Sequence, residues 1–212
     1  NEYMLVPHSS LYKYGIPENI LSKEAPDTYD WLSYYHDELL DTRIQNGKFF
    51  NPKINPFYRL DNVGEYTYSP FKVLWKEQTG SMSAVVVSTY LQSIPNADPT
   101  LFSKDKIIVV DSKVLMLDVY NEQEAYYVCG IINSPNIIEV VDGYAVSTNR
   151  GVDVLKYIAI PKYDASNELH NSIADISKHI HQLAQNCKSY SNEEKLLNEK
   201  VYTLFVEGDN EE

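Results

Sequence analysis

Residues 70–90, PFKVLWKEQTGSMSAVVVSTY, set two runs of β-favouring residues on either side of a short polar stretch. Branched and aromatic side chains favour strands, and Gly80 can supply a positive φ where the chain reverses. The stretch therefore predicts a β-hairpin whose loop is residues 77–81. Two further strands are predicted along the chain, at 106–110 and 113–119.

Helical patterns lie on both sides of these strands. After Asp27, apolar residues recur three or four positions apart, which predicts an amphipathic helix that Asp27 caps and Gly47 ends. Asn121 and Glu124 form an Asn-x-x-Glu capping box, which predicts the start of another helix. The helices predicted beyond the strands span residues 121–133, 134–143, 169–187 and 191–207, and a strand is predicted at 154–160.

The order of these elements predicts the fold class. Helices flank a run of strands instead of alternating with them, so we expect an α+β fold with central, mostly antiparallel strands, an N-terminal helix and C-terminal helices. We expect one main domain at residues 26–207, preceded by a lead-in at 1–25 and followed by an acidic tail at 208–212. The first residue is not methionine, which indicates a fragment of a longer polypeptide.

Composition excludes several classes of protein. The hydrophobic share of 43% and the charged share of 23% are typical of globular proteins. Two cysteines, Cys129 and Cys187, are too few for a disulfide framework or a four-cysteine zinc site, so a cytoplasmic location is expected. No run of 18 apolar residues occurs, so we expect no membrane partner. The net charge is −12, yet residues 43–80 carry six basic and three acidic groups, so the hairpin begins in a positive stretch.

The sequence carries no familiar catalytic motif. It lacks a Walker A loop, a Gly-x-Ser-x-Gly elbow and a His-Glu-x-x-His pair, so we expect no catalytic residue, cofactor or metal in this chain. Residues 55–58, NPFY, are similar to the Asn-Pro-Pro-Tyr motif that holds a flipped adenine, but the third residue differs and no cofactor loop precedes it. His179 and His181 are two residues apart on a predicted helix, so they face different directions and are expected to be solvated.

Four segments, taken in order, resemble the C-terminal target-recognition regions of TaqI-like adenine-N6 DNA methyltransferases and fused restriction-modification enzymes. The first includes the first strand of the predicted hairpin, and the other three include predicted helices. The segments are GEYTYSPFKVLWK at 64–76, NEQEAYYVCGIINSP at 121–135, GVDVLKYIAIPKYDASNELHNSIADISKHIHQLA at 151–184 and EEKLLNEKVYTLFVE at 193–207.

The resemblance implies a non-catalytic module that reads a DNA sequence for a prokaryotic methyltransferase. Its expected partners are double-stranded DNA and an N-terminal methyltransferase domain of the same polypeptide, and S-adenosylmethionine would bind in that domain. The chain departs from the family pattern in its closing residues. It also carries a net charge of −12, whereas a DNA-reading module normally shows a basic face.

Two polar loops are the candidates for contact with DNA. Lysine and arginine hold phosphates, while side chains with hydrogen-bond donors and acceptors meet base edges in the major groove. The predicted base-reading residues are Gln78, Thr79, Ser81, Ser147, Thr148, Asn149 and Arg150, and the predicted phosphate contacts are Lys72, Lys76 and Lys156. Both loops are also consistent with ordinary solvated turns.

Aromatic side chains near the hairpin admit two interpretations. Tyr66, Tyr68, Phe71 and Trp75 either stack on bases or pack the sheet, and their alternating positions favour packing.

Two other classes of function stay open. An acidic, tyrosine-rich surface is also typical of a protein-interaction module or a DNA mimic, and an enzyme with an unfamiliar site is the third class. Trp31, Tyr34 and Tyr35 either pack their helix or form a face for the missing catalytic domain.

Overall fold

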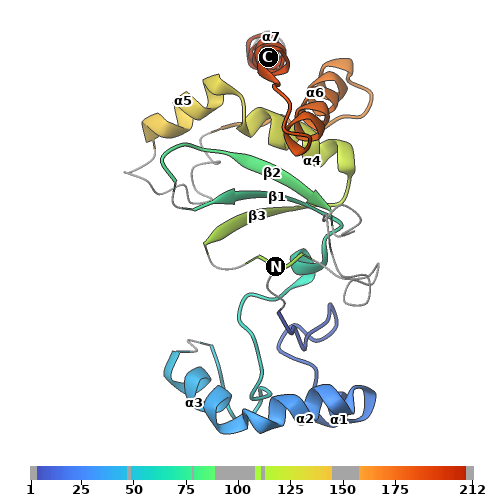
Figure 1. Ribbon diagram of the computed structural model, residues 1–212, viewed down its shortest axis with the longest axis vertical. Coiled ribbons are helices and arrows are strands. Elements are labelled where there is room, and N and C mark those ends of the chain that lie inside the picture. Colours follow the sequence, from blue (N-terminus) through green and yellow to red (C-terminus); the bar gives the residue numbers. More distant parts are fainter. Residues whose placement is uncertain are drawn as a thin grey trace. The chain divides into compact units, whose positions relative to one another are not determined.

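The computed structural model describes residues 4–46, 49–77, 79–88, 108–110, 113–144 and 158–208 (Figure 1). The chain divides into two compact units, Asn1–Tyr68 (unit 1) and Ser69–Glu212 (unit 2). The boundary expected after residue 25 is therefore replaced by one after residue 68. The reason is that Leu21 and Leu32, on either side of the expected boundary, are buried in the same apolar cluster.

Short helices build much of unit 1. They are α1 (Glu18–Glu24), α2 (Pro26–Tyr34), α3 (His36–Asn46) and the 3₁₀ helix η1 (Glu65–Tyr68). The single helix expected after Asp27 is thus divided, and Asp27 lies in the first turn of α2 because the helix begins at Pro26. Tyr35 interrupts the α-helical pattern, since its N–H bonds the carbonyl of Leu32, only three residues back.

The NPFY segment supplies much of the core of unit 1. Phe57 and Tyr58 are buried together with Leu21 and Leu32. The Tyr58 hydroxyl donates to the carbonyl oxygen of Ile16 at 2.6 Å. Buried rings and a satisfied hydroxyl give this segment a structural role in unit 1.

A three-stranded antiparallel sheet in the order β2-β1-β3 forms the framework of unit 2. Its strands are β1 (Phe71–Lys76), β2 (Ala84–Ser88) and β3 (Val114–Val119). β1 and β2 form the predicted hairpin, with Trp75 opposite Ala84, and β3 pairs with the other side of β1, with Leu115 opposite Trp75. The predicted hairpin and the predicted strand at 113–119 are confirmed.

The other two predicted strands are not found where the structure describes the chain. Residues 108–110 and 158–160 adopt no regular structure, and the rest of the predicted strands at 106–110 and 154–160 lies outside the described residues. Within the described residues, β3 pairs with β1 of the hairpin.

Helices cover one face of the sheet in unit 2 (Figure 1). They are α4 (Glu122–Ile132), α5 (Pro135–Tyr144), α6 (Glu168–Gln185) and α7 (Ser191–Gly208), which confirms the four helices predicted there. The Asn121 side chain accepts a hydrogen bond from the Glu124 backbone N–H at 3.1 Å, so the predicted cap is present. Helices and an antiparallel sheet together make the fold class α+β.

The core of unit 2 lies between the sheet and these helices. Val73 and Trp75 of β1 are buried in it, as is Ile173 of α6. α4 and α6 approach closely at Gly130, where an added Cβ would lie 3.0 Å from the side chain of Ser177. A glycine at this position therefore permits the close packing of the two helices.

Candidate functional site

The hairpin turn is the part of the predicted DNA interface that the structure describes best. Lys76 and Ser81 are exposed and Thr79 is half-buried. The Thr79 hydroxyl donates to the carbonyl oxygen of Ser81 at 2.9 Å, so the turn has internal order. The other predicted contacts outside β1, namely Gln78, Ser147, Thr148, Asn149, Arg150 and Lys156, lie outside the described residues.

Lys72 does not have the exposure expected of a phosphate contact. It is 1% exposed, and its Nζ donates to the carbonyl oxygen of Ser69 at 3.1 Å. Burial lowers the pKa of Lys72 to about 8, and the negative charge of Asp118, its partner on β3, acts in the opposite direction. A phosphate contact needs an accessible ammonium group. We therefore withdraw Lys72 from the predicted interface.

The aromatic residues near the hairpin separate into two groups. Trp75 is 3% exposed and Phe71 packs against the same core, so these two rings pack the sheet as the alternation favoured. Tyr66 and Tyr68 belong to η1 in unit 1, not to a strand, so the alternating pattern does not extend to them.

Side chains from the helices cap the outer edge of β2. Asn133 accepts from the Ala84 N–H and donates to the Ala84 carbonyl, both at 2.8 Å. His181 Nε2 accepts from the Val86 N–H at 3.1 Å, while its Nδ1 donates to the Ser177 carbonyl at 2.7 Å. These two bonds require the neutral tautomer with the proton on Nδ1. Within the described ranges no strand pairs with this edge of β2, and these side chains meet some of its backbone groups instead.

His181 differs from the solvated group that its spacing predicted, whereas His179 is exposed as expected. Burial lowers the pKa of His181, which agrees with a neutral ring. Cys129 lies beside it, with Sγ 3.8 Å from His181 Nε2, and burial raises the pKa of the Cys129 thiol to about 12. Such a thiol is protonated and unreactive at neutral pH, so this pair supports packing rather than nucleophilic chemistry.

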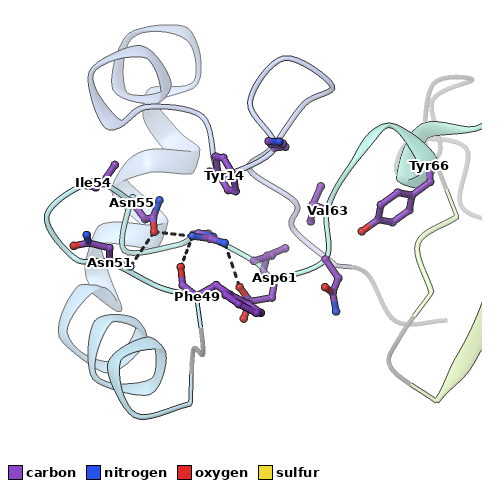
Figure 2. A pocket seen from close by; sticks show the side chains of 12 residues that line it. Tyr14, Phe49, Asn51, Ile54, Asn55, Asp61, Val63 and Tyr66 are labelled. Atoms are coloured by element: carbon purple, nitrogen blue, oxygen red, sulfur yellow. Dashed lines mark hydrogen bonds and ion pairs between the residues drawn. The ribbon is translucent and has the colours of Figure 1, made fainter.

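Unit 1 contains a hollow of about 550 Å³ with Arg59 in its wall (Figure 2). Arg59 Nη1 donates to the carbonyl oxygen of Phe49 at 2.8 Å and to Asn55 Oδ1 at 2.6 Å. Nη2 lies 3.7 Å from Asp61 Oδ1, and the guanidinium carbon lies 4.8 Å from the ring centre of Tyr14. These contacts fix the plane of the guanidinium group.

His8 is a second buried polar group of unit 1. Its Nε2 accepts from the Leu60 N–H at 3.1 Å, so in the neutral ring the proton is on Nδ1. Burial is the main reason that the pKa of His8 falls to about 4, and the positive charges of Arg59 and Arg43 lower it further. His8 is therefore neutral over the physiological range.

Sequence reasoning did not single out the hollow or His8. The one signal that pointed there was the positive stretch at residues 43–80, which includes Arg43 and Arg59. Spacing alone gave no reason to join His8 to that stretch, because 52 residues separate His8 from Leu60.

Within the described ranges, no three His, Cys, Asp or Glu side chains are grouped so that they could hold a metal ion. None of the helices in these ranges combines the length and apolar character needed to cross a membrane. Comparison with protein-family models, curated proteins and solved structures finds no match to this chain.

Proposed function

We propose that this chain reads the recognition sequence of a site-specific adenine-N6 DNA methyltransferase or fused restriction-modification enzyme and is itself non-catalytic. The observation that carries the proposal is the exposed polar turn between β1 and β2. The turn belongs to a hairpin with helices packed on one face. Asn133 and His181 bind the backbone at its outer edge. The ordered resemblance of four segments to target-recognition regions supports the same function.

A two-stranded ribbon has dimensions that fit the major groove. In the proposed complex, Lys76 contacts a phosphate while Thr79 and Ser81 present hydroxyl groups to base edges. Gln78 lies between Lys76 and Thr79 in the sequence, and its amide suits the paired donor and acceptor of adenine. The loop at 147–150, with Lys156, forms the second part of the proposed interface.

The chemistry would take place in an N-terminal methyltransferase domain of the same polypeptide, which would bind S-adenosylmethionine. An aromatic cluster on α2 is our candidate for contact with that domain. Trp31 and Tyr34 are 56% and 83% exposed, and their rings lie 5.2 Å and 4.9 Å from the ring of Tyr35. Exposed aromatic clusters of this kind are enriched at protein–protein interfaces.

Duplex DNA binding by the whole chain tests the proposal. Lys76→Ala should weaken binding to all sequences alike and reduce the slope of log affinity against log salt by about 0.9. Ser81→Ala should instead reduce the preference for the recognised sequence, by about 1–3 kcal/mol if the hydroxyl reads a base. Lys195→Ala, an exposed lysine on α7, is the matched control and should change neither quantity. Equal effects of Lys76→Ala and Lys195→Ala would count against the hairpin as the DNA-binding element.

The net charge of −12 favours one competing function, a protein-interaction module or DNA mimic with an acidic surface. Such a module would displace DNA from a DNA-binding enzyme without binding a duplex itself. A competition experiment that includes the chain, a duplex and a DNA-binding enzyme separates the two functions.

A further inference from the structure

Among the described residues of unit 1, three buried nitrogen atoms have no hydrogen-bond partner: His8 Nδ1, Arg43 Nε and Arg59 Nε. His8 and Arg59 are 6% and 8% exposed. Both arginine atoms are donors, and His8 Nδ1 is a donor too because Nε2 accepts from Leu60. What these three groups lack is therefore an acceptor, and a buried donor without an acceptor is destabilising.

Arg59 offers the most specific of these groups. Its Nη1 donates to the Phe49 carbonyl and to Asn55 Oδ1. The edge formed by Nε and Nη2 is therefore the one that can bind a further acceptor. Asp61 Oδ1 is 3.7 Å from Nη2, which is beyond hydrogen-bond distance. The two parallel N–H groups of a guanidinium edge match two oxygens of a phosphate or carboxylate.

The surroundings of Arg59 favour a phosphate joined to a flat, apolar group. The hollow is also lined by Lys13, whose Nζ lies 4.9 Å from the centre of the Tyr14 ring. Phe49 lines the same hollow and is 71% exposed (Figure 2). A volume of about 550 Å³ is in the range of small-molecule sites.

We propose that this hollow binds the phosphate of a nucleotide. The Nε–Nη2 edge of Arg59 binds two phosphate oxygens, Lys13 adds a second positive charge, and the base stacks on Phe49. The nucleotide is either free or part of a DNA strand, since both present the same chemistry. The inference goes beyond the proposed function because it concerns unit 1 and none of the hairpin residues.

Calorimetric titration of the whole chain with inorganic phosphate, deoxyadenosine monophosphate and a short single-stranded oligonucleotide tests this inference. We expect saturable binding, with the nucleotide about tenfold tighter than inorganic phosphate because stacking adds about 1.4 kcal/mol. Tighter binding of the oligonucleotide than of the nucleotide identifies a DNA strand as the source, and equal or weaker binding identifies the free nucleotide. No saturable binding of any of the three at millimolar concentration would mean that water meets the donors, and would overturn the inference.

Variants that spare the buried guanidinium keep the test interpretable. Asp61→Asn should tighten binding of all three probes several-fold, because the carboxylate competes for Arg59. Phe49→Ala should remove the advantage of the nucleotide but leave inorganic phosphate unchanged. Lys13→Gln should weaken all three, by about tenfold for a charge-assisted contact, whereas the exposed Lys23→Gln on α1 is the control. If none of these substitutions changes the binding of the three probes, the probes bind at another site and the proposal is contradicted.

The hairpin variant Lys76→Ala separates this inference from the proposed function. It should leave nucleotide binding unchanged. If duplex recognition fails while Asp61→Asn still tightens nucleotide binding, the proposed function falls and the phosphate site stands.

Discussion

The two units differ in how they treat buried polar groups. In unit 2, both hydrogen bonds of Asn133 and one of the two of His181 reach the edge of β2, and the one buried side-chain atom without a partner among the described residues of this unit is an acceptor, Gln123 Oε1. In unit 1, His8, Arg43 and Arg59 each keep a buried donor without an acceptor. A buried donor without an acceptor destabilises a fold, and of the three donors only that of Arg59 belongs to a residue that lines the hollow, where the proposed phosphate would meet it.

The largest effect is expected from a substitution in the core of unit 2. Ile173 of α6 is fully buried, so Ile173→Ala should lower the free energy of unfolding of unit 2 by about 2–5 kcal/mol. The chain has two tryptophans, and in a Trp31→Phe background the fluorescence of Trp75 reports on unit 2 alone. Leu196→Ala removes a residue that is 45% exposed and is the control. Equal losses for the two variants would show that the helices do not form the core described here.

A change of pH should affect unit 1 through His8. The native pKa is about 4 against an ordinary value of 6.5, so between these values the unfolded chain binds a proton that native His8 does not. Stability is therefore fully present above pH 6.5 and falls as the pH drops towards 4, by at most about 3 kcal/mol. The same unfolding series on His8→Gln, followed by amide signals of unit 1 in NMR spectra, should lose this part of the pH dependence. An unchanged pH profile would contradict the burial of a neutral imidazole.

A smaller effect is expected at the capped edge of β2. Asn133→Ala removes both hydrogen bonds to Ala84, so the free energy of unfolding should fall by about 1–3 kcal/mol. The exposed edge should also promote association of the chain at high concentration, which sedimentation measures. Asn136→Ala, at an exposed position in α5, is the matched control. A variant that stays as stable and as monodisperse as the control would show that Asn133 does not protect this edge.

Local sequence patterns were sufficient for the elements that local forces determine. The β1–β2 hairpin follows from β-favouring runs around Gly80, and α4 follows from the cap at Asn121, whose side chain accepts from the Glu124 N–H in the structure. The sequence did not predict the division of the helix after Asp27. The apolar spacing continues through Tyr35, but the α-helical hydrogen bonding of α2 ends there.

The properties of individual side chains depended on tertiary contacts that spacing does not encode. His181 looked solvated from its helix position, but it accepts a hydrogen bond from Val86, 95 residues away. Lys72 looked like a surface cation in a positive stretch, but it is buried on the sheet next to Asp118. For the same reason the Arg59 hollow could not be predicted, since it joins Tyr14 to residues after position 48.

Selection of duplexes from a random-sequence library by the whole chain is the sharpest test of whether the hairpin turn reads DNA. We expect enrichment of one defined sequence, and loss of that enrichment in a variant that combines Thr79→Ala with Ser81→Ala. Lys195→Ala should enrich the same sequence as the parent chain. If the parent chain enriches no sequence, or if the Thr79→Ala and Ser81→Ala variant enriches the same one, the hairpin turn does not read DNA and the proposed function is contradicted.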